Sequence, residues 1–246
     1  MDRWGLALCA LAIVAILFGF TLEGGHLALL WNGPAILIVM VGSILATLAQ
    51  MPLSHIKPLS HLLSWLIAPP NLNLDGLIAK LTACANAQRR DGVLALEKLA
   101  TLETDPVVQR ALTMLTDGYD QTHLLETIEL ELATRDARDN ELLDHLDQLA
   151  SYLPTLGIVG AVLGLMQVLS SIKDPDALAA GIATAFVATF YGVAAANVVV
   201  IPLANRLRQI LALRRRYYQA MLVGIVSLRQ EVNPMVLRFR MQGISL

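Results

Sequence analysis

The chain has 246 residues, of which 56% are hydrophobic and 15% are charged, with a formal net charge of −2. Soluble domains usually carry about 25% charged residues, so the composition argues against a soluble protein and for an integral membrane protein. The two cysteines, Cys9 and Cys84, give neither a disulfide framework nor a metal-binding spacing. The cysteines thus give no reason to expect a bound metal. We also expect no other cofactor, no enzyme activity and no nucleic-acid partner.

Charged residues are absent from four segments, which are residues 4–22, 24–56, 148–172 and 177–205. A helix of about 20 apolar residues spans a bilayer, and each segment is close to that length or longer. Residues 57–147 hold 15 acids and eight bases. These features predict an all-α integral membrane protein with four transmembrane helices and a helical cytoplasmic domain between the second and the third. The expected segments are 1–52, 53–147, 148–205 and a basic tail, 206–246.

The first transmembrane helix is expected at about Trp4–Leu22, and we interpret it as a retained helix because no signal-peptidase site follows it. A short outer loop should lead through Asn32 to a second helix from about Pro34 to Met51. Several prolines should then break the chain as it leaves the membrane; these are Pro52, Pro58, Pro69 and Pro70.

The central domain has apolar residues at helical spacing. We expect helices from Leu74, over Val93–Leu102 and from Asp105, with Asp105 as N-cap and a proline at the first helical position. A last helix should begin near Leu124 and continue, without glycine or proline before the membrane, into the third transmembrane segment.

The loop between the last two membrane segments is short, Lys173–Asp176, and Lys173 is the one basic residue of the two expected outer loops. The positive-inside rule therefore places both termini and the central domain in the cytoplasm. Residues 57–147 carry a net charge of −7 and residues 204–246 a net charge of +7. Either these regions attract each other, or the tail lies on anionic lipid headgroups.

The third and fourth segments contain no ionisable acid or base, although a proton pump would normally carry one in the membrane. They offer polar groups instead, at Thr155, Thr189, Tyr191 and Asn197. Small residues that allow close helix contact occur at Gly157, Gly160, Gly164, Gly181 and Gly192. These residues fit either ordinary packing or a polar interface that receives a charged residue from a different chain.

Two further patterns have alternative interpretations. Pro154 and Pro202 stand near the cytoplasmic ends of the two segments and are either plain kinks or a matched hinge. Arg89, Arg90 and Glu97 flank an Asp-Gly break and form either solvated surface or a docking patch of mixed sign.

Three segments resemble the MotA/PomA/MotC family of flagellar stator proteins, and the resemblance covers nearly the whole chain. The first is Tyr152-Leu-Pro-Thr-Leu-Gly-Ile-Val-Gly160. The second is Ala185-Phe-Val-Ala-Thr-Phe-Tyr-Gly-Val193, followed by Asn197 and Pro202-Leu-Ala-Asn205. The third is Arg89-Arg-Asp-Gly-Val-Leu-Ala-Leu-Glu97.

The resemblance implies a homo-oligomeric ring, with five subunits, in the bacterial inner membrane. The ring would surround two single-span helices of a MotB-type partner that supplies the ion-carrying Asp. Arg89, Arg90 and Glu97 match residues that face the rotor protein FliG, and Pro154 and Pro202 match prolines tied to the coupling motion.

The resemblance also implies an ion path. Thr155 and Thr189 match hydroxyls near that path, and Asn32 stands where sodium-driven relatives have Asp. The translocated ion would be H⁺ or Na⁺; the hydroxyls suit sodium, whereas the uncharged Asn32 favours protons.

There are two alternatives, one from the same superfamily and one from a different class of protein. A TolQ/ExbB-type energiser of outer-membrane processes would have one membrane helix before the cytoplasmic loop, whereas this chain has two early apolar runs. A membrane scaffold without ion flow would not need the paired threonines and prolines.

Overall fold

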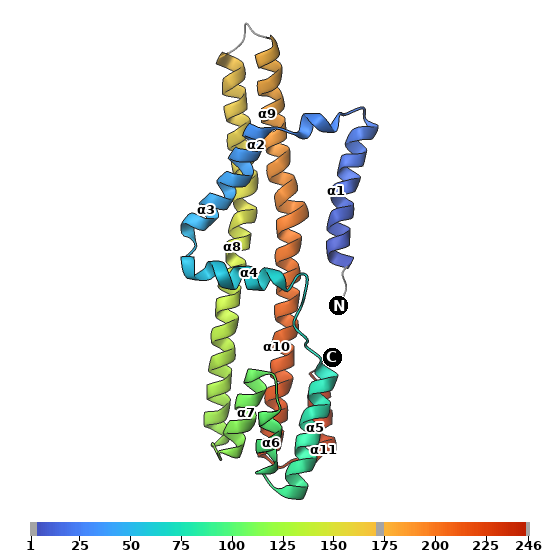
Figure 1. Ribbon diagram of the computed structural model, residues 1–246, viewed down its shortest axis with the longest axis vertical. Helices are drawn as coiled ribbons and strands as arrows, with labels where there is room; N and C mark the ends of the chain where they lie inside the picture. Colours follow the sequence, from blue (N-terminus) through green and yellow to red (C-terminus); the bar gives the residue numbers. More distant parts are fainter. Residues whose placement is uncertain (1–3, 171–174, 245–246) are drawn as a thin grey trace. The chain divides into compact units, whose positions relative to one another are not determined.

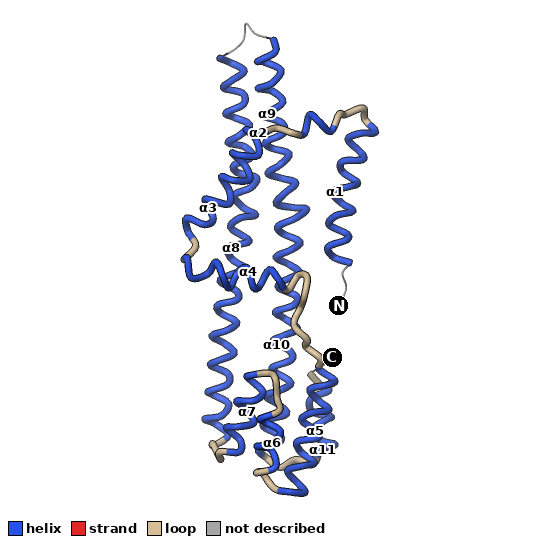
Figure 2. Tube along the Cα trace, in the orientation of Figure 1, coloured by secondary structure: helices blue, strands red, loops and turns tan. Residues whose placement is uncertain are grey.

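Figure 1 shows the computed structural model, which describes residues 4–170 and 175–244, with side chains described for 7–170 and 178–244. Over these ranges the chain forms helices and loops and no strand (Figure 2). The helices are α1 (Trp4–Leu22), η1 (Leu27–Leu30), α2 (Gly33–Ile36), η2 (Leu37–Val41), α3 (Gly42–Gln50), η3 (Leu53–His55), α4 (Ile56–Ser64), α5 (Leu74–Asp91), α6 (Ala95–Thr101), α7 (Pro106–Thr116), α8 (Gln121–Ser170), α9 (Pro175–Ala194), η4 (Ala195–Val200), α10 (Ile201–Arg229) and α11 (Pro234–Gln242). The predicted all-α fold is confirmed.

Most expected helices form where the sequence places them. The first runs over Trp4–Leu22 as predicted. The second is helical from Gly33 to Gln50 and includes the π-helical turn η2. The predicted long helix is α8, a single helix of 50 residues. Lys173 and Asp174 of the expected outer loop lie outside the described residues.

The prediction that Pro58 breaks the chain is wrong. Pro58 is the third residue of α4, a nine-residue helix that the sequence did not indicate. The N–H groups of the first helical turn have no partner within the helix, so a proline in that turn removes no helical hydrogen bond. Pro154, in contrast, lies inside α8, where a proline does remove a helical hydrogen bond.

Three helical stretches within the described ranges are long and apolar enough to cross a membrane, namely Gly33–Gln50, Gln121–Ser170 and Leu178–Arg229. The apolar helix near the N-terminus is shorter than these three stretches, because its side chains are described only over Ala7–Leu22. The chain therefore has the apolar helices of a membrane protein.

The chain divides into two compact units. Unit 1 consists of Met1–Ala68 and Asn140–Arg208, and unit 2 consists of Pro69–Asp139 and Gln209–Leu246. In unit 1, α2 and η2 pack on α9, and the buried side chains of this contact are small or branched, as at Ala35, Val39 and Ala188. Their small volume allows the helices to approach closely.

Unit 2 has its own apolar core, formed by α5, α6, α7, α11 and parts of α8 and α10. Its most deeply buried large side chains are Leu77, Leu81, Leu96, Leu112, Leu115, Leu124, Ile128 and Met221. Residues 206–246 are expected from the sequence to form a basic tail. Two residues of this segment, Leu228 and Leu237, are instead fully buried in the core of unit 2. Residues 209–244 are therefore an integral part of unit 2.

Ion pairs within unit 2 explain the opposite charges of the two sequence regions. The Arg214 guanidinium pairs with both Asp136 and Asp139, and Arg215 Nε lies 2.8 Å from an oxygen of Asp136. The Arg214 side chain is only 12% exposed. These basic residues of α10 therefore pair with acids of α8.

Candidate functional site

Unit 1 contains a close contact between α8 and α9, which run side by side (Figure 1). A Cβ atom on Gly164 would lie 2.8 Å from the carbonyl oxygen of Gly181, and one on Gly160 would lie 2.8 Å from the Cβ of Ala188. Real Cβ atoms essentially never approach other atoms closer than 3.0 Å. Glycine at these positions therefore allows the two backbones to touch.

Pro154 lies at the same contact. A Cβ atom on Gly192 of α9 would be 3.1 Å from the Cα of Pro154. The proline has no N–H, so the carbonyl of Ala150 loses its usual helical donor. The irregular point of α8 is thus packed directly against a residue of α9 that has no side chain.

Thr155 and Thr189 belong to the two helices that form this contact. Thr155 Oγ1 donates to the Tyr152 carbonyl at 2.9 Å, and Thr189 Oγ1 donates to the Ala185 carbonyl at 3.2 Å. A Cβ atom on Gly157 would lie 3.4 Å from the Cα of Thr189, which places this threonine beside α8. A hydroxyl that donates its proton can still accept, so each oxygen can bind a water molecule or a cation.

Asn32 caps the N-terminus of α2 and also joins this helix to α9. Its Oδ1 accepts the Ala35 N–H at 3.0 Å and caps α2, while its Nδ2 donates to Thr184 Oγ1 at 2.8 Å. This second bond joins α2 to α9. Sequence gave no signal for it, because the two residues are 152 positions apart.

Tyr191 forms a second hydrogen bond between α9 and another segment of unit 1. Its hydroxyl donates to the carbonyl of Leu30 in η1. The hydroxyl group of this half-buried side chain therefore lies where η1 meets α9. Among the predicted ion-path residues, Asn32 and Tyr191 thus connect chain segments, whereas the hydroxyls of Thr155 and Thr189 bond within their own helices.

Asn197 and Pro202 lie at the junction of α9 and α10. The exposed Asn197 stands in the π-helical turn η4, and its Nδ2 donates to the Val193 carbonyl at 2.9 Å. Pro202 follows two residues after η4 ends. A proline ring clashes with the carbonyl four residues before it, and a widened turn relieves such a clash.

The predicted charged patch lies in unit 2, where Arg89 and Arg90 lie in the last turn of α5 and Glu97 lies in the first turn of α6. All three side chains are exposed. Gly92 connects the helices with φ +80°, a conformation that L side chains rarely adopt. The turn thus presents charges of both signs on neighbouring helix ends.

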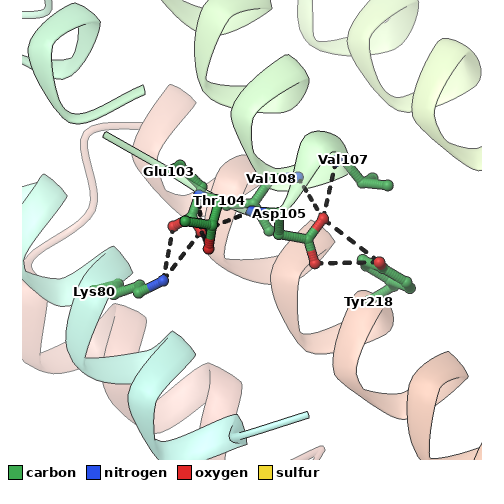
Figure 3. Close-up of polar contacts among 7 residues, drawn as sticks. All are labelled: Lys80, Glu103, Thr104, Asp105, Val107, Val108 and Tyr218. Carbon is green, nitrogen blue, oxygen red and sulfur yellow. Dashed lines mark hydrogen bonds and ion pairs between the residues drawn. The ribbon is translucent and has the colours of Figure 1, made fainter. Parts of the chain in front are cut away.

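A polar cluster fixes the loop that follows α6 (Figure 3). Lys80 Nζ lies 3.0 and 3.1 Å from the two oxygens of Glu103, whose carboxylate also accepts the N–H groups of Thr104 at 2.8 Å and Asp105 at 3.0 Å. The Glu103 side chain is only 7% exposed. Burial alone would raise the pKa of Glu103, but the hydrogen bonds from Asp105, Lys80 and Thr104 hold the pKa below its ordinary value.

Asp105 completes the cluster as the predicted N-cap of α7. Its Oδ1 accepts the Val107 N–H at 2.9 Å, and its Oδ2 accepts the hydroxyl of Tyr218 from α10 at 3.2 Å. Burial and the negative charge of Asp105 raise the pKa of Tyr218, so the phenol remains a donor at neutral pH. Sequence indicated the Asp-Pro cap but neither Glu103 nor Tyr218, because their contacts join separate helices.

Within the part of the chain that the structure describes, no group of three or more His, Cys, Asp or Glu side chains could hold a metal ion. Each unit thus has its own candidate feature: unit 1 has a close helix pair with polar groups, and unit 2 has a charged, exposed helix turn.

Comparisons with known proteins agree with one another. Residues 100–219 match the MotA/TolQ/ExbB proton channel family. The chain is similar to motility protein A of Bacillus subtilis (strain 168), at 31% identity over 238 residues, covering 96% of this chain and 88% of the relative. Its fold is similar to a chain of the C. jejuni MotAB structure, with a TM-score of 0.93 and 27% identity, covering 99% of this chain and 96% of that one. A second similar fold occurs in the flagellar MotAB stator complex from Bacillus subtilis, with a TM-score of 0.88 and 29% identity, covering 98% and 93% of the two chains.

Proposed function

This chain belongs to the MotA/TolQ/ExbB proton channel family as a flagellar stator subunit, and we propose that it drives rotation by passing ions between itself and a MotB-type partner. The observation that carries the proposal is the match of almost the entire chain to chains of MotAB structures. In this proposal five copies form a ring around two single-span helices of the partner.

The proposed placement in the bacterial inner membrane uses four spans, with α1 as the first. Both termini and unit 2 are then cytoplasmic. The support comes from charge: 17 of the 18 Lys and Arg residues lie outside the proposed outer loops. Arg214 and Arg215 of unit 2 also pair with an acid of the same unit, Asp136.

The proposed ion path lies along the partner's Asp and the polar groups of α8 and α9. Residues 148–172 and 177–205 contain no acid or base, so the charged group has to come from another chain. Thr155 and Thr189 would solvate the ion, each through an oxygen that retains acceptor capacity. Tyr191, Asn197 and Asn32 would support this path.

We propose H⁺ as the translocated ion, with Na⁺ as the alternative. Sodium-driven relatives carry Asp at the position of Asn32, and the uncharged amide attracts Na⁺ less than a carboxylate would. A proton needs only the partner's carboxylate and a chain of water or hydroxyl groups. No resident cofactor takes part in this scheme.

Coupling between ion flow and rotation would act through Pro154 and Pro202. Neutralising the partner's Asp removes a charge from a low-dielectric interface, and one elementary charge crossing 100 mV releases about 2.3 kcal/mol. The prolines each remove one helical hydrogen bond, so the helices can bend there at lower cost. The ring would then step around the partner.

Torque would reach the rotor through Arg89, Arg90 and Glu97. These exposed charges of both signs suit a partner surface with the complementary pattern, which gives orientation and fast association. We propose the rotor protein FliG as that partner.

The proposal is tested in a motile bacterium from which its own stator genes are deleted. Expression of this chain with its MotB-type partner should restore swimming, and replacing the partner's membrane Asp by Asn should abolish it. Swimming with the Asn partner, or with this chain alone, would contradict the mechanism.

A further inference from the structure

Unit 1 contains an apolar cavity of about 580 Å³ between α1 and α9. The rings of Phe20, Phe186 and Phe190 line it together with Leu17 and other aliphatic side chains. Among the described residues of its lining, Glu23 is the one that carries a charge. This size and this apolar lining with a single polar group are typical of small-molecule binding sites.

The cavity runs inward from the membrane surface, given the membrane placement proposed above. Glu23 is the first charged residue after the uncharged residues 4–22, so it marks the end of the first span. The neighbouring Trp31 is 80% exposed, and tryptophan is enriched at the level of lipid headgroups. Glu23 therefore lies at headgroup depth, and the phenyl rings of α9 lie deeper.

The lining is unlike the contact between α8 and α9. Where α8 meets α9, glycines such as Gly164 and Gly181 allow backbone contact. Close packing of small residues is what drives helix association in lipid. The cavity presents phenyl rings instead, and Phe186 is 74% exposed. Such a surface suits a flexible acyl chain better than another helix.

We propose that this cavity binds one phospholipid of the outer leaflet with an ethanolamine headgroup. Its acyl chain lies against Phe20, Phe186 and Phe190, and its ammonium group pairs with the Glu23 carboxylate. A primary ammonium donates up to three hydrogen bonds, whereas a choline headgroup has no N–H to donate. The carboxylate thus selects the ethanolamine lipid.

The test uses the complex of this chain with its MotB-type partner, reconstituted into phosphatidylcholine vesicles. Trp4, Trp31 and Trp65 are replaced by Phe, and Phe190→Trp supplies a fluorescent reporter in the cavity. Phosphatidylethanolamine or phosphatidylcholine with brominated acyl chains is then added as the quencher. Leu11→Trp, at a 61% exposed position on α1, reports on ordinary surrounding lipid.

The ethanolamine lipid should quench the reporter at position 190 with about twofold to fivefold higher apparent affinity than the choline lipid, because both headgroups are positively charged and the difference is that of a weak exposed hydrogen bond. Glu23→Gln should remove that preference, and the Leu11→Trp reporter should show none. Absence of quenching at position 190 would mean that protein covers the cavity. Equal quenching by both lipids, or a preference that survives Glu23→Gln, would also overturn the proposal. Because the readout is fluorescence, it does not depend on motility.

Discussion

A Cβ atom on Gly192 would lie 2.4 Å from the carbonyl oxygen of Leu153, the residue immediately before Pro154. The contact joins α9 to the one point of the membrane part of α8 where a proline interrupts the hydrogen bonding. Any side chain at position 192 would have to push the two helices apart. The glycine and the proline therefore form one structural feature.

Gly192→Ala should destabilise this helix contact by about 1–3 kcal/mol, the usual cost of inserting a methyl group into a packed site. The expected results are a lower thermal unfolding temperature of the purified stator complex and reduced swimming. Gly19→Ala is the matched control, because no atom lies within 4 Å of its added Cβ. An unchanged unfolding temperature for Gly192→Ala would contradict the close contact.

Pro154→Ala and Pro202→Ala should each restore a helical N–H and stiffen the helix at that point. We expect complexes that assemble but rotate slowly or not at all, measured by tethering cells and recording flagellar rotation. Pro58→Ala is the control, since Pro58 stands in the first turn of α4, where no helical hydrogen bond is missing. Normal rotation in both variants would reduce the two prolines to passive kinks.

Reversal of the charged turn, by Arg89→Glu together with Arg90→Glu, should lower torque without removing the protein from the membrane. The two side chains are exposed, so the substitution leaves the core of unit 2 unchanged. Arg138→Glu together with Arg216→Glu, both at exposed positions, changes the net charge by the same amount and serves as the control. The measurement is rotation speed under load in a strain without another stator, and full torque would exclude a docking role.

Glu103→Ala should destabilise unit 2 at neutral pH by about 1–3 kcal/mol, because the N–H groups of Thr104 and Asp105 and the Lys80 ammonium lose their acceptor. The pKa of Glu103 is lowered from its ordinary value of 4.5, so its ionised form stabilises the fold above about pH 4.5. This contribution is lost as the pH falls through the lowered pKa of the folded state.

Thermal unfolding of the complex, monitored at several pH values, checks this expectation. The difference between the original protein and Glu103→Ala should shrink as the pH falls below 4.5. Glu126→Ala, at an exposed position on α8, should show little difference at any pH. A difference for Glu103→Ala that stays constant with pH would contradict the role of the ionised carboxylate.

The sequence predicted the helices well, since their signals are local. Apolar spacing and the Asp105 cap located α5 and α7, and the lack of charged residues located the apolar segments. It missed α4 because Pro58 reads as a helix breaker unless the helix start is known. Local patterns thus gave helix positions but not every boundary.

Contacts between distant residues could not be predicted in the same way. The bond from Asn32 to Thr184 and that from Tyr218 to Asp105 join residues more than 100 positions apart, and no periodicity marks them. The glycines of α8 and α9 did carry a signal, since small residues at helical spacing indicate a close contact.

The central claim is that ions cross only when this chain and its MotB-type partner are combined, and voltage-driven ion flux into vesicles tests it most directly. Vesicles with this chain alone should not conduct, whereas vesicles with both chains should. Thr189→Val should weaken the flux of the complex, because the hydroxyl that solvates the ion in an apolar surrounding is lost. Robust flux through this chain alone would contradict the two-chain mechanism.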